Sequence, residues 1–239
     1  MIARMRAPHP PFDPAGAPVC PGDVAATPFL DATWLVQQPY AAFFCEENVW
    51  QLCCNTALQP RAWALIITNT SRTVAMWNQR ATTIDPIVWD YHVVTVVADA
   101  VTPALIIDET IVGEIVVLDQ DCRAGTVLPL QRWLMASFRA GLYDDVRPRF
   151  RLVPAADFST SFSSDRRHML DHEGRPLKPL PPWPAPNAER GSSLARILDL
   201  DDASVGNDNH LQGEVLDIEG LARRFGVKNL QLPRISLEP

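Results

Sequence analysis

The spacing of apolar residues predicts an amphipathic helix over residues 46–58. Val49, Leu52 and Cys53 recur at the i, i+3, i+4 interval of one helical face, and Pro60 follows as a helix breaker. The same periodicity predicts further helices over 129–140 and, with Gly226 as its stop, over 217–229. The predicted helices therefore lie near the start, the middle and the end of the chain, and the residues between them follow another pattern.

The region after the first helix has the composition of β-strands. Runs rich in Val, Ile, Trp and Thr alternate with Asn, Ser, Asp and Pro, which are typical of turns. The predicted strands are residues 64–68, 73–77, 87–98 and 113–119, a shorter one at 104–107, and RFRLVPAADF at 149–158. A helix followed by mainly sequential strands predicts an α+β domain with a central antiparallel sheet.

Three segments show where the predicted domain begins, where its centre lies and where it contains a long loop. IVWDYHVVTVV, at 87–97, is apolar on both faces toward its end, which favours a central strand covered on both sides. Residues 1–28 are rich in Pro, Ala and Gly without periodicity, and we expect a loose arm there, followed by a single catalytic domain at 29–239. The proline-rich stretch 175–186 is expected to be extended loop.

Composition narrows the class of protein. The chain has 239 residues, 47% apolar content and a net charge of −7, so no basic excess favours nucleic acid or an anionic membrane. No stretch approaches eighteen apolar residues, and MIARMRAPHPPF lacks the apolar core of a secretory signal. The 5 cysteines show no disulfide framework. These features predict a cytoplasmic protein with free thiols.

Cys45 is the candidate nucleophile. It precedes the first predicted helix, where exposed N–H groups and the helix dipole favour a thiolate. Glu46 and Glu47 follow it directly, and we expect their side chains to point away from the thiol. His92 lies in an apolar strand, where an imidazole needs a hydrogen-bond partner.

The acid of a catalytic triad is left open between Asp119 and Asp121, which end the strand EIVVLD and lie two residues apart. On residue types alone, a buried cysteine and a hydrogen-bonded core histidine are the simpler interpretation of Cys45 and His92. A metal site built from Cys45, Cys53 and Cys54 is disfavoured because its spacing lacks a C-x2-C knuckle. SSDRRHM at 163–169 fits a capped, solvated turn.

Several unusual strings resemble the protein N-terminal glutamine amidohydrolase family. They are CEENVWQLC at 45–53, VWDYHVV at 88–94, TVLP at 126–129, FRLVPAADFSTSFSSDRRHM at 150–169, PLPPWPAP at 179–186 and RFGVKN at 224–229. The strings occur in the family's order and cover roughly residues 40–230. CEENxWxLC and WDYHV are too long for chance agreement.

The resemblance implies a monomeric enzyme with a papain-like or transglutaminase-like α/β roll and the nucleophile on a helix N-terminus. By motif position, Cys45 is the nucleophile, His92 the base and Asp119 the orienting acid. The enzyme would convert an N-terminal glutamine of a protein or peptide to glutamate and release ammonia, without a metal or other cofactor. In eukaryotes, membership would place the product in a degradation pathway. The inserted CRAG at 122–125 departs from the family pattern near Asp119.

Recognition of a chain terminus requires a carboxylate that pairs with the free α-ammonium. The candidates are Glu47, Asp90 and Asp165. Asp90 shares one face of the predicted strand with His92, and the other two lie in matched motifs. Two alternatives stay open: a deamidase or transglutaminase that acts on an internal glutamine, and a non-catalytic module that binds N-terminal residues.

Overall fold

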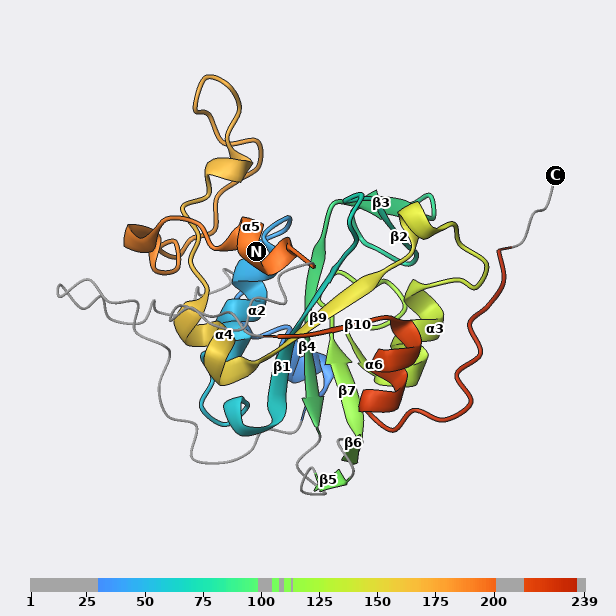
Figure 1. Ribbon diagram of the computed structural model, residues 1–239. Helices are drawn as coiled ribbons and strands as arrows, with labels where there is room; N and C mark the ends of the chain where they lie inside the picture. The colour runs from blue at the N-terminus through green and yellow to red at the C-terminus, as the bar shows by residue number, and fades with distance from the viewer. Residues whose placement is uncertain (1–29, 99–104, 108–109, 113, 201–212, 236–239) are drawn as a thin grey trace, which may run out of the picture.

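The computed structural model describes residues 30–98, 105–107, 110–112, 114–200 and 213–235, and its centre is an antiparallel sheet (Figure 1). The sheet has 6 strands in the order β10-β9-β1-β4-β7-β8. Their bounds are Ala62–Thr68 (β1), His92–Ala98 (β4), Ile115–Leu118 (β7), Val127–Pro129 (β8), Arg149–Pro154 (β9) and Glu214–Leu216 (β10). Two further pairs join Val74–Met76 (β2) to Ile87–Trp89 (β3) and Leu105–Ile107 (β5) to Thr110–Val112 (β6). The predicted α+β class and antiparallel sheet are confirmed.

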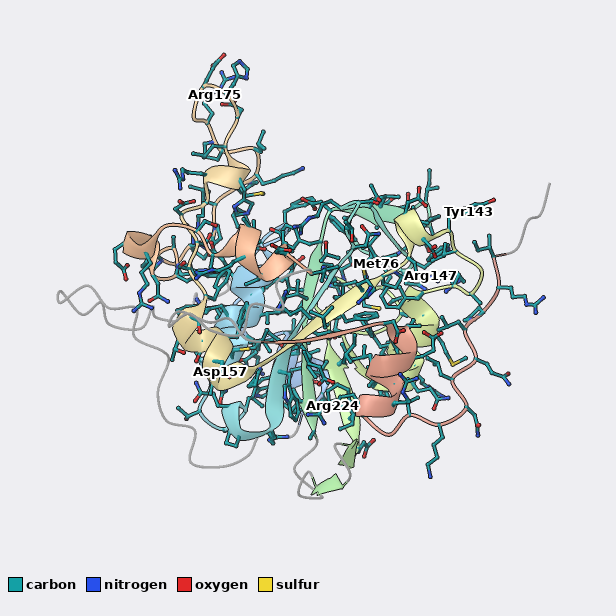
Figure 2. All side chains as sticks on the ribbon, in the orientation of Figure 1. Met76, Tyr143, Arg147, Asp157, Arg175 and Arg224 are labelled. Atoms are coloured by element: carbon teal, nitrogen blue, oxygen red, sulfur yellow. The ribbon has the colours of Figure 1, made fainter. Side chains whose placement is uncertain are left out.

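Helices cover both faces of the sheet, and side chains fill the space on each side (Figures 1 and 2). The helices are Ala32–Leu35 (α1), Cys45–Cys53 (α2), Leu130–Ser137 (α3), Ala155–Ser161 (α4), Leu194–Leu198 (α5) and Ile218–Arg224 (α6). Successive residues of a strand point to opposite faces. Ala64 and Ile66 thus join the core beneath α2 and α4, whereas Leu65 and Ile67 join the core beneath α3 and α6.

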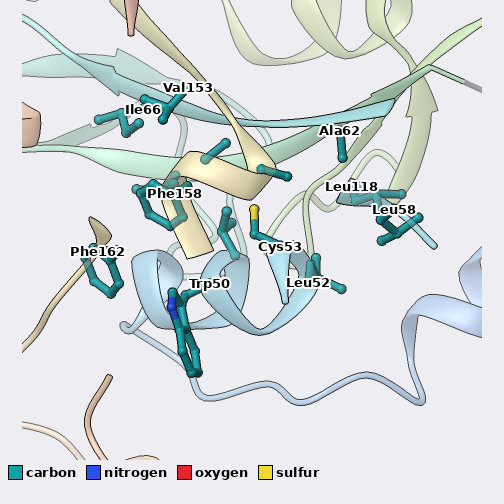
Figure 3. Close-up of a cluster of buried hydrophobic side chains, with 14 of the residues drawn as sticks. Trp50, Leu52, Cys53, Leu58, Ala62, Ile66, Leu118, Val153, Phe158 and Phe162 are labelled. Carbon is teal, nitrogen blue, oxygen red and sulfur yellow. The ribbon is translucent and has the colours of Figure 1, made fainter. Parts of the chain in front are cut away.

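The core beneath α2 holds that helix against the sheet (Figure 3). The rings of Phe158 and Phe162 stack with centroids 4.9 Å apart, and Trp50 donates its indole N–H to the Ser159 carbonyl at 2.9 Å. Cys53 is fully buried, and its sulfur points from α2 toward the sheet in Figure 3. Cys53 and its buried neighbour Cys54 belong to the apolar packing, as the sequence predicted.

The predicted strand 87–98 is wrong as one element, because it is interrupted at Asp90 and Tyr91. β3 pairs with β2, whereas β4 pairs with β1 and β7. At the break, the Thr68 hydroxyl donates to the Asp90 carbonyl at 2.9 Å, and the Asp90 side chain accepts the Tyr91 N–H at 3.0 Å. These bonds replace those of a continuous ladder. His92 therefore becomes the first residue of β4, which is central and fully buried as predicted.

The predicted strand 149–158 is wrong in its second half. β9 ends at Pro154, and Ala155–Ser161 forms α4. Pro154 occupies the N-cap and Asp157 lies in the first turn, where an acidic side chain complements the helix dipole. The short elements β8, β10 and α5 were not predicted.

The other predicted elements are found with shifted ends. α2 starts at Cys45 and stops at Cys53, short of the predicted 58. α3 and α6 lie within the predicted helices, and Asp217 caps α6 by accepting the Gly220 N–H at 2.7 Å. Gly226 has φ +64° and the Val227 N–H bonds the Ala222 carbonyl, a glycine-terminated helix end.

Other predictions concern loops and termini. Residues 175–186 contain turns and bends but no helix or strand, as expected. The arm predicted at 1–28 and the ends of the strands predicted at 104 and 113 lie outside the described residues. Among the residues that are described, no helix is long and apolar enough to cross a bilayer.

Phe158→Ala is expected to lower the free energy of unfolding by about 3–5 kcal/mol, because it leaves a cavity between α2, α4 and the sheet. Tyr143, an aromatic residue with 84% of its surface exposed at the periphery (Figure 2), is the matched control. Tyr143→Ala should change the free energy by less than about 0.5 kcal/mol. Urea unfolding measures both, and equal midpoints for the two variants would contradict the packing described.

Candidate active site

Cys45 is the first residue of α2. The loop that leads into it has a constrained backbone. Phe43 has φ +70°, a left-handed conformation that is uncommon for a bulky residue. The Asn48 side chain closes the loop by accepting the Ala41 N–H at 2.8 Å and donating to the Ala41 carbonyl at 2.9 Å. Asn48 thereby fixes the approach to Cys45 from within the helix that Cys45 begins.

The surroundings of the thiol keep it protonated in the free protein. Burial raises the pKa of Cys45 well above its usual value, and the charges of Glu46 and Asp121 raise it further. The backbone N–H of Val93 acts in the opposite direction. Glu46 does not point away as expected, because the thiol donates to its Oε2 at 3.6 Å. The helix N-terminus alone therefore does not produce a thiolate.

A buried histidine and carboxylate lie next to this helix. His92 opens β4 and Asp119 follows β7, which pairs with β4. His92 Nε2 lies 3.1 Å from Asp119 Oδ1, with side-chain exposures of 4% and 1%. Asp119 Oδ1 also accepts the Asp121 N–H at 3.1 Å, and its Oδ2 accepts the Trp133 indole N–H at 3.0 Å. Three donors therefore hold this one carboxylate.

The two groups stabilise each other's charge. Burial alone would lower the pKa of His92, but the charge and hydrogen bond of Asp119 outweigh it and raise that pKa. Burial alone would likewise raise the pKa of Asp119, but His92 and Trp133 hold it below its ordinary value. The Trp89 ring stacks on the imidazole with centroids 6.1 Å apart. The paired carboxylate therefore makes His92 a stronger proton acceptor, because it stabilises the imidazolium that forms.

Asp119 is the carboxylate that contacts His92, whereas Asp121 contacts another residue. Asp121 accepts the Tyr40 hydroxyl at 2.5 Å, and burial raises its pKa. The inserted residues 122–125 form a turn, and the Asp119 N–H bonds the Thr126 carbonyl at 2.9 Å across its base. The insertion therefore leaves Asp119 in contact with His92.

Cys45 and Asp119 line the same narrow pocket between α2 and the ends of β4 and β7. Its lining residues are Cys45, Asn48, Val49, Leu52, Val93, Leu118, Asp119, Gln120 and Asp121. Val93 is the neighbour of His92 in sequence. The pocket thus brings together the elements that carry the predicted nucleophile, base and acid.

The three carboxylates predicted to bind substrate have other partners. Glu47 is fully buried, and its two oxygens accept from Arg166 Nε and Nη2 at 2.8 and 2.7 Å and from Trp183 Nε1 at 2.9 Å. Asp165 pairs with Arg167 at 2.7 Å.

Asp90 is exposed and lies in the break between β3 and β4, so the shared strand face inferred for it is wrong. A role of Glu47, Asp90 or Asp165 in binding the substrate stays a prediction.

Sequence reasoning missed a second buried group beside the thiol. Glu46 has no exposed surface, and the His168 Nε2 lies 3.4 Å from its Oε1. The Tyr91 hydroxyl lies 3.5 Å from the same histidine nitrogen. The paired glutamates and the HM of SSDRRHM were the available signals, but only the fold shows that they meet.

Three side chains of this site are also of the types that bind metal ions. Ligand atoms of His92, Asp119 and Asp121 lie within 4.8 Å of one another. However, His92 and Asp119 bond each other, and Trp133 occupies the second Asp119 oxygen. These contacts fit an acid–base pair better than a metal centre.

The chain is similar in sequence to one family of known proteins. The family model of N-terminal glutamine amidase matches residues 40–225. The chain is 31% identical over 206 residues to the protein N-terminal glutamine amidohydrolase of Homo sapiens, covering 80% of this chain and 89% of that protein. Its counterpart from Danio rerio is 29% identical over 203 residues, covering 79% and 90%. That of Drosophila melanogaster is 32% identical over 156 residues, covering 61% and 70%.

His92 is expected to titrate above the ordinary histidine pKa of 6.5, because Asp119 stabilises its charged form. Asp119→Asn removes that charge, so the pKa of His92 should fall. NMR titration of the His92 imidazole in the native protein and in Asp119→Asn measures both values. A His92 pKa that is unchanged by Asp119→Asn would contradict the pairing.

Proposed function

Because the chain belongs to the N-terminal glutamine amidase family, we propose that it deamidates N-terminal glutamine through Cys45, His92 and Asp119. The substrates are proteins or peptides that present this residue, and the product is N-terminal glutamate with release of ammonia. The observation that carries the proposal is the 3.1 Å contact between His92 and Asp119 beside a pocket lined by Cys45.

The arrangement supports a papain-like or transglutaminase-like roll. In such a roll the nucleophile starts a helix, and its base and acid come from neighbouring strands of the sheet on which the helix packs. Cys45 at the start of α2, His92 at the start of β4 and Asp119 after β7 match this plan. The predicted reducing cytoplasm agrees with the free thiols of Cys45, Cys53, Cys54 and Cys122.

The first half of the reaction transfers the acyl group to sulfur. His92 takes the proton of the Cys45 thiol, and the sulfur attacks the side-chain amide carbon of the glutamine. Because Nε2 faces Asp119, Nδ1 is the nitrogen that exchanges protons with the reaction. Backbone N–H groups in the first turn of α2, including that of Cys45, hold the oxyanion. The imidazolium then protonates the leaving nitrogen, so ammonia departs and a thioester remains.

The second half releases the product. Neutral His92 takes a proton from water, and the resulting hydroxide attacks the thioester carbon. The carbon–sulfur bond breaks, the proton returns to Cys45, and glutamate leaves. Asp119 holds the ring in one tautomer and stabilises the imidazolium in both halves.

The mechanism predicts that Cys45→Ala abolishes ammonia release and that His92→Ala lowers kcat by roughly 10²–10⁴-fold, because the acid–base step is lost. KM should change far less. The assay measures ammonia from a Gln-initiated peptide, with N-acetylated, internal-Gln and Asn-initiated peptides as controls.

The controls separate the alternatives. Equal release from the acetylated peptide would favour a deamidase or transglutaminase acting on internal glutamine. Binding of the Gln-initiated peptide without release would favour a non-catalytic module. Native activity in Cys45→Ala would contradict the assignment of the nucleophile.

A further inference from the structure

Two adjacent glutamates at the start of α2 have opposite surroundings. Both Glu46 and Glu47 are fully buried. Glu47 is paired through both oxygens with Arg166 and Trp183. Among the residues that the structure describes, Oε1 of Glu46 has no hydrogen-bond partner. Burial of an incompletely paired carboxylate is costly, so its presence requires a reason.

The group closest to compensating this charge is partly exposed. The His168 Nε2 lies 3.4 Å from Glu46 Oε1, beyond an ordinary hydrogen bond, and 24% of its side chain is exposed against 1% for Glu46. Burial alone would lower the pKa of His168, but the nearby negative carboxylate of Glu46 outweighs burial and raises that pKa. Its pairing with Glu46 therefore favours the imidazolium.

His168 belongs to a segment that extends away from the sheet. It lies in the short 3-10 helix Arg167–Met169, at the base of the loop that carries Arg175 to the outermost position labelled in Figure 2. The imidazole thus reaches Glu46 from a segment outside the helices that pack on the sheet.

Glu46 also lies at the right distance from the reacting atom. Its Oε2 is 3.6 Å from the Cys45 sulfur. In glutamine, four bonds of about 1.5 Å separate the α-nitrogen from the amide carbon, so the two atoms are at most about 5 Å apart. An ammonium about 2.8 Å from a Glu46 oxygen can thus coexist with an amide carbon about 3.3 Å from the sulfur.

We propose that Glu46 binds the α-ammonium of the N-terminal glutamine, which takes the position that the His168 imidazole holds in the free protein. The inference rests on the proposed function and adds the group that restricts it to chain termini. An internal glutamine offers an uncharged amide at this position and leaves Glu46 unpaired. Glu46 replaces Glu47, Asp90 and Asp165 as the residue assigned to this contact.

Binding of the ammonium also activates the nucleophile. The negative charge of Glu46 opposes ionisation of the adjacent Cys45 thiol, second only to burial. At about 2.8 Å from Glu46, a bound ammonium neutralises that charge more fully than the His168 imidazole does at 3.4 Å, so the thiolate forms more readily once the correct substrate is present. The same contact thereby serves recognition and chemistry.

The test of binding uses Cys45→Ala, so that no turnover interferes. Calorimetry compares a Gln-initiated peptide with its N-acetylated form, on Cys45→Ala and on Cys45→Ala with Glu46→Gln. The substitution keeps the side-chain size and removes the charge. It should weaken binding of the free-amine peptide roughly 10- to 100-fold, as expected for a charge-assisted hydrogen bond, and leave the acetylated peptide nearly unaffected.

Glu47→Gln in the same background is the matched control. It should lower the melting temperature, because Arg166 loses its carboxylate partner, but retain the preference for the free amine. Loss of that preference in Glu47→Gln and its retention in Glu46→Gln would overturn the proposal. Failure of the proposed function is seen separately, as no ammonia release from the Gln-initiated peptide by the native protein.

A second readout tests the activation. Glu46→Gln in the otherwise native protein should react faster with neutral iodoacetamide at Cys45 near neutral pH, yet turn over Gln-initiated peptides more slowly. Peptide mapping identifies the labelled cysteine, and Cys45→Ala is the blank. A purely structural role for Glu46 would change folding without this opposite pair of effects. Alkylation no faster than in the native protein would overturn the link between ammonium binding and thiol activation.

Discussion

The His92–Asp119 contact is a charged pair almost completely removed from water, and the surrounding fold compensates for that removal. Desolvation of a carboxylate and an imidazolium costs several kcal/mol each, so the pair persists only where further donors satisfy the remaining oxygens. The indole of Trp133 in α3 and the backbone N–H of Asp121 provide them. Pairing of β4 with β7, the turn after β7 and the packing of α3 must all be in register for these donors to meet.

On the other side of the pocket, negative charges are not balanced as completely as in the His92–Asp119 pair. The N-terminus of α2 places the Cys45 thiol among negative groups, with Glu46 3.6 Å from the sulfur. Burial and these charges raise the pKa of the thiol, so it stays protonated until a substrate binds rather than being permanently ionised. Arg166 neutralises only Glu47. The partner of Glu46 is the partly exposed His168, 3.4 Å away, and an N-terminal substrate carries a positive charge next to its glutamine side chain that can take this place.

Much of this architecture was predictable from the chain. Helical periodicity located α2, and the run of Val residues after His92 identified a central strand, because burial on both faces leaves no polar alternation. The break at Asp90 was not predictable, since it depends on the hydroxyl of Thr68 from another strand. The motifs predicted Cys45, His92 and Asp119 as the triad, but not the Trp133 indole and the Asp121 N–H that bond Asp119. The pairing of Glu46 with His168, 122 positions along the chain, arises only when the segment after α4 folds back over α2.

The central claim, that Cys45 is a nucleophile activated by His92, can be tested with a peptide whose N-terminal glutamine carries a diazoketone in place of the side-chain amide. Attack by the thiol on this group expels dinitrogen and leaves a stable thioether, which peptide mapping by mass spectrometry locates. The account predicts a single adduct on Cys45 that forms much more slowly in His92→Ala and is absent in Cys45→Ala. An adduct on another residue, or an equal rate of labelling without His92, would contradict it.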